Sequence, residues 1–301
     1  MIEAPRLSAG DLARPAERWA MPSRRARWNA TFRILALLAL LSASAILLVL
    51  LWTLARKGVP YINADLFRNF SSRRPSRSGI KAALFGSLYV VLIASAVAVP
   101  VGVAAAVYLE EFNTRKTKFT NFLQVNIANL SGVPSIIYGL LGLGVFVRAF
   151  GFGFSLLAGA LTLALLILPT IILVSQEALR AVPKSYRDAS AALGVSPWGT
   201  IRHQVLPSAM SGIITGIILS VSRALGEAAP LITIGAATFI DFTPGKLTDR
   251  FTALPIQIFD WIGRPQSGYQ DKAAAAIVVL LGMLLVLNSV AIFFRARARR
   301  R

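Results

Sequence analysis

The sequence contains no cysteine and a single histidine, and these two shortages exclude several kinds of site. Without cysteine the chain has no disulfide bond, no thiolate metal site and no cysteine nucleophile. The one histidine, His203, is expected to be an ordinary solvated side chain. No GxxxxGK[ST] stretch occurs, so the chain carries no P-loop for ATP. We therefore expect a protein that is not an enzyme and that has no catalytic residue, bound metal or cofactor.

Acidic residues are also scarce, with 13 Asp and Glu against 32 Lys and Arg, which gives a formal net charge of +19. Such an excess can indicate binding to nucleic acid. Here, however, the basic residues lie mostly in tails and loops that flank long apolar segments. In membrane proteins this arrangement sets the orientation of the chain. We therefore expect membrane lipid, and no nucleic acid, among the partners.

Long apolar runs dominate what is present, since 55% of the residues are hydrophobic. About 20 apolar residues in a helix cross the ~30 Å hydrocarbon core of a bilayer. A soluble helical domain would instead show polar residues at helical period. The sequence predicts an all-α polytopic membrane protein with about six transmembrane helices. These are expected at 34–54, 82–108, 122–150, 154–175, from about 206, and at 273–294.

The orientation of the spans follows from the basic residues at the two ends. Arg24, Arg25 and Arg27 precede the first span, and RARARRR ends the chain. Because basic residues favour the cytoplasmic side, we expect both termini in the cytoplasm. No obvious cleavage site follows the first apolar run, so it is interpreted as a retained span rather than a signal peptide. The expected parts are a mobile basic tail at 1–30, the first span and an outer loop at 31–79, a core at 80–295 and a basic tail at 296–301.

The expected outer loop at 56–79 does not fit this charge rule, because it carries six basic residues. A basic outer surface can attract anions. The alternative is a tolerated exception to the rule, which we favour.

The cytoplasmic connection contains the most specific pattern, SYRDASAALGVSPWGTIRHQVLPSA at 185–209. Ser185 followed by Asp188 indicates a capping box at the start of a short helix. Gly194 is placed to end that helix in a left-handed conformation. Ser196 is placed to cap a second short helix. The pattern predicts a compact helix–turn–helix, either as a plain connector or as a rigid docking element.

The spacing of this stretch resembles the EAA loop of permease subunits of bacterial ABC importers. That loop has an acidic–Ala–Ala start, a glycine four residues later and a Leu-Pro about twelve residues after the glycine. The matching positions are Asp188, Ala189, Ser190, Gly194, Leu206 and Pro207. Asp replaces the usual Glu, and Ser replaces the second Ala. The resemblance implies a type I ABC importer permease fold whose loop at 176–205 carries a coupling helix that docks on an ATPase subunit.

The fifth span carries one polar stripe at helical spacing, made of Gly212, Gly216, Ser220, Arg223 and Glu227. The two glycines form a GxxxG pattern, which permits close helix approach. Arg or Asp at the centre of a membrane helix costs about 2.5–3.5 kcal/mol, so such residues normally face a bundle interior or a wet path.

Two interpretations of the charged residues are open. Arg223 and Glu227 can neutralise each other and lock helices together. Alternatively, Arg223 offers a guanidinium fork to a passing oxyanion, while Glu227 keeps it paired when no anion is present. We favour the second interpretation and assign Ser220 to the same pathway, because buried ion pairs stabilise poorly compared with apolar packing.

Two other features concern helix breaks and polar residues. The apolar run from 206 to 240 would reach ~50 Å as one helix, so Pro230 is expected to end the straight helix. The first half of the third span is polar, and its residues either line the pathway or bond across helices, which we favour. These residues are Asn126, Asn129, Ser131, Pro134 and Ser135.

Three segments resemble phosphate-specific permeases of the PstA type. SRALGEAAPLITIGA resembles their Arg-x-x-Gly-Glu-Thr-Ala-Pro-Leu signature, with Ala228 where Thr is usual. NLSGVPSIIYGLLGLG resembles their Gly-x-Pro-Ser-x-x-Tyr-Gly segment, and ALPIQIFDW resembles part of their last outer loop. The resemblance covers roughly residues 80–295.

This resemblance implies a subunit in the bacterial cytoplasmic (inner) membrane that imports phosphate. The implied partners are a homologous second permease subunit, two ATP-binding subunits and an extracytoplasmic phosphate-binding protein. One alternative is an ABC permease for another oxyanion or small solute. A second is an ATP-independent channel or carrier with Glu227 as a proton site. The 185–209 loop argues against the second, because such a carrier has no ATPase to dock.

Overall fold

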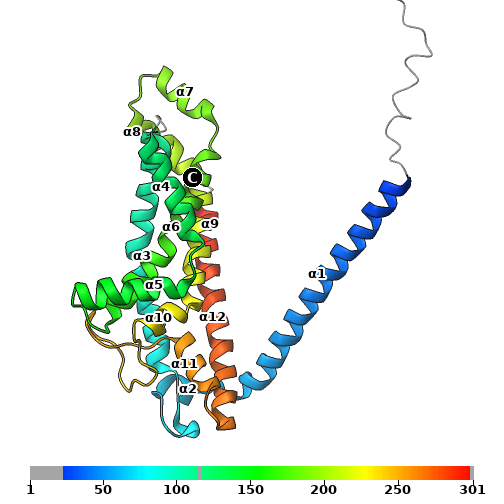
Figure 1. Cartoon of the computed structure of the whole chain (residues 1–301), viewed down its shortest axis with the longest axis vertical. Helices are drawn as coiled ribbons and strands as arrows, with labels where there is room; N and C mark the ends of the chain where they lie inside the picture. Colours follow the sequence, from blue (N-terminus) through cyan, green and yellow to red (C-terminus); the bar gives the residue numbers. More distant parts are fainter. Residues whose placement is uncertain (1–22, 114–116, 299–301) are drawn as a thin grey trace, which may run out of the picture. The chain divides into compact units, whose positions relative to one another are not determined.

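The computed structural model describes residues 23–113 and 117–298, in which every regular element is helical (Figure 1). The chain divides into two units, residues 1–53 and 54–301, and each is described by itself. Most of the tail predicted at 1–30, and residues 299–301 of the tail predicted at 296–301, lie outside the described residues.

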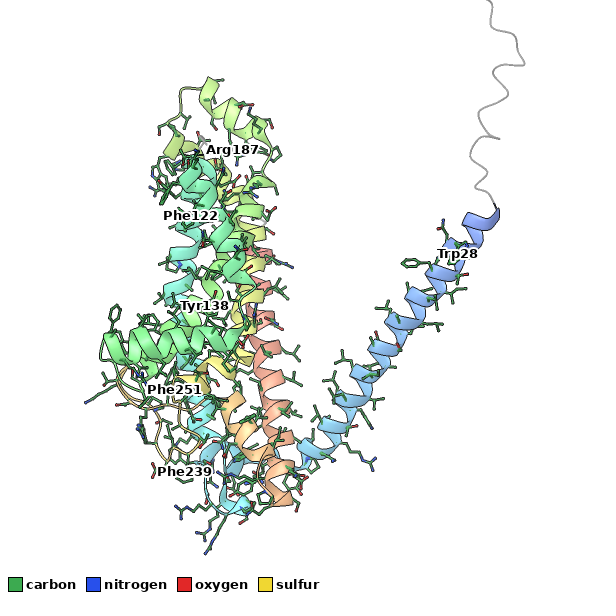
Figure 2. All side chains as sticks on the ribbon, viewed as in Figure 1. Trp28, Phe122, Tyr138, Arg187, Phe239 and Phe251 are labelled. Atoms are coloured by element: carbon green, nitrogen blue, oxygen red, sulfur yellow. The ribbon has the colours of Figure 1, made fainter. Side chains whose placement is uncertain are left out.

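The first unit consists of most of α1 (Ser23–Gly58), which is longer at both ends than the span expected at 34–54. Its apolar residues surround the helix rather than forming one stripe, and residues 28–53 are all exposed. Trp28, for example, is 69% exposed (Figure 2). A helix that is apolar all round fits a hydrocarbon environment.

The second unit is built on α3 (Lys81–Val107), α6 (Leu156–Arg180), α9 (Leu206–Gly226) and α12 (Ser267–Ala298). Helix α6 is central because it packs along both α3 and α9, and α12 packs against α9 (Figure 1). Small residues allow this close approach. A β carbon at Gly216 would lie 2.2 Å from Val174, and one at Gly212 would lie 2.8 Å from Ala178. The predicted glycine face is therefore confirmed as a contact with α6.

The third span expected at 122–150 is bent and is not one continuous helix. The segment forms α4 (Lys118–Ser131) and α5 (Ser135–Gly142), and α5 continues as a π-helical segment, Leu143–Ala149. The two parts are bent by 107°. Pro134 explains the break, because proline lacks the amide hydrogen and disfavours a helical conformation in the preceding residue. Among the described residues, five helices are long and apolar enough to cross a membrane, or six if the bent pair counts as one span.

The fifth span also differs from expectation at both of its ends. It runs without a break from α8 (Pro197–Thr200) through a π-helical segment, Ile201–Val205, into α9. Pro207 therefore lies inside a continuous helix, and the wider π-helical turn before it accommodates the ring. The helix ends at Gly226 rather than at Pro230, which instead lies in the first turn of the short α10 (Ala229–Thr233), a position that proline tolerates.

The basic segment 56–79 is folded onto the start of α12. It contains α2 (Ala64–Arg68). Helix α11 (Leu254–Ile262) also packs on α12. The hydroxyl of Tyr269 donates a 2.7 Å hydrogen bond to the carbonyl of Ser72. The amide of Gln257 donates to Ser71 Oγ over 3.3 Å. These contacts fix the segment as an ordered cover at this end of the unit.

Candidate functional site

The charged pair in the fifth span forms as the spacing predicts. Nε of Arg223 donates to Oε1 of Glu227 over 3.3 Å. Glu227 has an extended backbone and directly follows Gly226, the last residue of α9. Within this single chain the Arg223 side chain is 49% exposed and that of Glu227 is 17% exposed. The pair thus lies at a helix end with the guanidinium group half open.

Helix α5 and helix α10 meet beside this pair. The hydroxyl of Tyr138 on α5 donates a 2.7 Å hydrogen bond to the carbonyl of Leu130 on α4. A β carbon at Gly139 would lie only 2.7 Å from Cα of Pro230. Two of the sequence motifs, at 129–144 and 222–236, are therefore in direct contact in the folded chain.

The other residues predicted for the pathway are placed differently. Ser220 is buried, and its hydroxyl donates to the carbonyl of Gly216 over 2.9 Å, within α9. On α4, the side chains of Asn126 and Ser131 donate to the carbonyls one turn earlier, at 2.7 Å each. These bonds run within α4, whereas we had favoured bonds across helices. Asn129 is exposed on α4, Pro134 lies at the bend and Ser135 begins α5.

The predicted helix–turn–helix at 185–209 is present as α7 (Lys184–Ala192) and α8. The capping box at Ser185 is wrong, because α7 follows Pro183 directly and has no side-chain cap. The left-handed stop at Gly194 is confirmed by a φ of +71°. The cap at Ser196 is confirmed too, since its hydroxyl accepts from the amide of Gly199 over 3.2 Å.

The tip of this helix–turn–helix presents side chains outward. Asp188 and Ala189 are exposed, whereas Ser190 is buried and donates to the carbonyl of Tyr186 over 2.9 Å. Large apolar side chains are exposed here as well, with Leu193 at 83% and Trp198 at 55%. Leu206 and Pro207 lie further on, in the continuous helix.

Sequence reasoning missed a group of ion pairs behind α7. Arg187 donates from Nε and Nη2 to the two carboxylate oxygens of Glu111, with an Nε–Oε2 distance of 3.0 Å. Arg180 donates to Glu110 over 2.9 Å and to Glu177 over 3.0 Å. The adjacent acids at 110–111 were a usable signal, because the chain has only 13 acidic residues.

The fold defines the class of protein. The structure of a bacterial ABC transporter involved in the import of the acidic polysaccharide alginate is similar, with a TM-score of 0.61 and 15% identity. The match covers 90% of this chain and 99% of that chain. The fold is therefore that of an ABC importer permease, as the sequence predicted.

The family follows from the sequence comparison. The chain belongs to the family described as "Binding-protein-dependent transport system inner membrane component", whose model matches residues 98–301. It is thus a multi-pass inner-membrane permease component, a non-catalytic subunit whose transport system depends on a binding protein.

Named relatives support the assignment. The chain is 37% identical over 221 residues to the "Probable ABC transporter permease protein YqgI" of Bacillus subtilis, covering 72% of this chain and 73% of that protein. It is 36% identical over 225 residues to the "Phosphate transport system permease protein PstA 1" of Mycobacterium tuberculosis, covering 74% and 72% of the two chains.

Proposed function

We propose that this chain is a permease subunit of an ATP-driven phosphate importer, with both termini in the cytoplasm. It pairs with a homologous second permease subunit to form the pathway. Two ATP-binding subunits dock on the cytoplasmic side, and an extracytoplasmic phosphate-binding protein delivers the cargo. The name of the relative from Mycobacterium tuberculosis supports phosphate as the cargo, and so does the SRALGEAAPLITIGA motif.

The observation that carries the proposal is the half-open guanidinium group of Arg223. In the described part of the chain its one hydrogen bond runs from Nε to Glu227, at 3.3 Å. Charge-assisted bonds of this kind are usually about 2.7–2.9 Å long, so this contact is loose. The Nη groups of Arg223 are left to bind two oxygens of a tetrahedral anion, a geometry that arginine matches better than lysine.

Glu227 sets how long such an anion stays. A single arginine in a low-dielectric path would attract phosphate strongly. A carboxylate within hydrogen-bond reach competes for the same guanidinium group and lowers the affinity of the site for the anion. Ser220 lies one turn before Arg223 on the same stripe, but its buried hydroxyl is bonded inside the helix, so it offers no bond to the anion.

The exposed tip of α7 and α8 is the proposed docking element for an ATPase subunit. Leu193 and Trp198 present exposed apolar surface there. The left-handed conformation of Gly194 makes the turn after α7 sharp, so α7 forms a short projecting helix. A rigid element transmits domain motion better than a flexible loop.

The experiment is uptake of labelled phosphate at micromolar concentration, in cells where this chain provides the only high-affinity route. Wild type is compared with Arg223→Ala and Arg223→Lys at matched membrane levels. Hydrogen bonds to charged groups contribute about 1.5–3 kcal/mol. Alanine should therefore lower uptake at limiting phosphate by roughly 10- to 100-fold, and lysine should restore only part of it.

Other results would point elsewhere. Equal transport by all three proteins would make the pair structural and remove Arg223 from the site. If wild type moves sulfate or another solute but no phosphate, the family stands and the cargo is different. Phosphate uptake that continues without ATP or an ATPase subunit would indicate a carrier, and the docking role of α7 would be wrong.

A further inference from the structure

Helix α7 has little apolar anchorage to the rest of the chain. The buried cluster at this end of the unit contains Val182, just before α7, and Ile201, just after α8. Among the described residues, it contains none of the positions between them. Burial of apolar side chains therefore does not fix the position of α7, and its polar and aromatic contacts decide how firmly it is held.

Those contacts converge on the end of α3. Helix α3 continues into a π-helical segment, Tyr108–Phe112. Glu111 in this segment accepts both bonds from Arg187 of α7, and the ring of Phe112 stacks on Trp198 of α8, with centroids 6.2 Å apart. The segment 184–200, which comprises α7 and α8, is called the coupling tip below. Both of its short helices are thus bonded to or stacked on two consecutive residues of one membrane helix.

The ion pair between Arg187 and Glu111 is well enclosed for a position outside the core. The side chain of Glu111 is 8% exposed and that of Arg187 is 27% exposed. Arg187 also donates to the carbonyls of Val182 and Leu179, over 2.9 and 3.1 Å. A guanidinium group with four bonds has one orientation, and a bidentate carboxylate pair adds direction as well as strength. Figure 2 shows Arg187 at the α7 end of the unit.

The second pair is less suited to this task. Arg180 is 45% exposed and joins Glu110 to Glu177, which is itself 72% exposed. Exposed pairs contribute little, because water screens the charges. Of these ion pairs, only that of Glu111 with Arg187 links α7 directly to a membrane helix.

We infer that Glu111 and Arg187 are positioning residues that make α7 and α3 move as one body, so that displacement of α7 by an ATPase subunit reaches the membrane helices. Helix α3 packs along the central α6, so it distributes the motion to the bundle. The inference rests on the proposed docking of α7 on an ATPase. Without the pair, α7 could rotate relative to α3 about the chain segments that precede and follow it. Part of its displacement by the ATPase subunit would then not reach the membrane helices.

The first test measures rigidity and does not depend on the cargo. Because this chain has no cysteine, it can be labelled with nitroxides at two of its sites only, before assembly with its partner subunits, through Ala104→Cys on α3 and Ala191→Cys on α7, both exposed. In the assembled transporter, electron paramagnetic resonance should give one narrow distance distribution, unchanged between the nucleotide-free and ATP-bound states. Glu111→Gln should broaden it. An equally narrow distribution in this variant would overturn the inference.

The second test measures coupling, as phosphate moved per ATP hydrolysed in proteoliposomes that contain the complete transporter and its binding protein. Glu111→Gln and Arg187→Gln should each lower this ratio by at least roughly fivefold while ATP hydrolysis continues. The control is Glu177→Gln, which removes an exposed carboxylate from the same surface and should leave the ratio unchanged.

Charge reversal separates a specific pair from a folding effect. Glu111→Arg combined with Arg187→Glu rebuilds the ion pair but not the bonds to Val182 and Leu179, so it should recover part of the lost ratio. No recovery in an assembled complex would overturn the inference. So would loss of the ATPase subunit from every variant, because the pair would then serve assembly alone. If wild type moves no phosphate, the cargo proposal fails while the distance measurement still tests the pair.

Discussion

At the scale of single residues, the site depends on positions where no side chain fits. Gly139 faces Pro230, and a β carbon there would lie 2.7 Å from both the Cα of Pro230 and the Cβ of Thr233. Backbone atoms cannot rotate away as the end of a long side chain can. The glycine therefore permits the contact between α5 and α10, close to the end of α9 that carries Arg223. Only glycine fits at position 139 because of the close contact with Pro230. The sequence alone does not reveal which of its glycines lies at such a contact.

We expect Gly139→Ala to destabilise the protein by about 1–3 kcal/mol, the usual cost of forcing extra volume into a packed site. The expected result is a lower unfolding temperature in detergent and weaker phosphate uptake. Gly144→Ala is the matched control, because a β carbon there meets nothing within 4 Å. Equal unfolding temperatures for the two variants would mean that α5 and α10 separate easily.

At the scale of helices, apolar runs in the sequence locate most spans but do not reveal where a span bends. The expected spans at 82–108 and 273–294 correspond to α3 and α12, because twenty or more apolar residues leave few alternatives to a membrane helix. The bend after α4 was missed although Pro134 was noted, since hydropathy reports composition and carries no information on the angle between two segments. The pair of Arg187 and Glu111 was missed because 76 residues separate the partners.

The start of α6 depends on a turn in the loop between α10 and α11. The amides of Leu156 and Leu157 donate to the carbonyls of Asp249 and Leu247, each over 2.9 Å. The Asp249 carboxylate in turn accepts from the amides of Lys246 and Gly245, over 2.8 and 2.9 Å. These amides lower the pKa of Asp249 below its ordinary value of 3.8. The negative charge therefore supports the folded turn.

A lowered pKa gives a definite sign of pH dependence. The stabilisation is fully present above the ordinary pKa of 3.8 and is lost as the pH falls through the lower pKa of the folded turn. We expect the amides of Leu156 and Leu157 to keep their hydrogen-exchange protection, corrected for intrinsic rates, from neutral pH to about pH 4 and to lose it below. In Asp249→Asn their protection should be lower already at neutral pH. Equal protection in both proteins at neutral pH would exclude this role of the carboxylate.

At the scale of the whole molecule, the membrane bundle and the coupling tip are expected to differ in how well they tolerate substitutions. The bundle is packed through α6, whereas Leu193 at the tip is 83% exposed and contributes nothing to the core of this chain. A substitution there should leave the fold intact and affect only a partner. The sequence predicts the permease class because Asp188, Gly194 and Leu206 have the spacing of the family's loop. The sequence indicates the cargo less directly, because the proposed anion site rests on Arg223 and Glu227 alone.

We expect Leu193→Asp to lower the amount of ATPase subunit that co-purifies by at least roughly tenfold, since it replaces a contact worth about 1.5–3 kcal/mol with a charge. The unfolding temperature of the isolated permease should not change. Phe239→Asp is a matched control, because Phe239 is also exposed, at 47%, but lies in the loop after α10 (Figure 2). Normal recovery of the ATPase subunit with Leu193→Asp would show that it docks elsewhere.

The unbroken helix from Pro197 to Gly226 has a mechanical consequence. At 1.5 Å per residue it is a lever arm of roughly 44 Å, with the coupling tip at one end and Arg223 near the other. A tilt of about 5° about one end displaces the opposite end by ~4 Å, more than the length of a hydrogen bond. A small tilt of this helix is therefore enough to make or break a contact between the guanidinium group and the anion that we propose it binds.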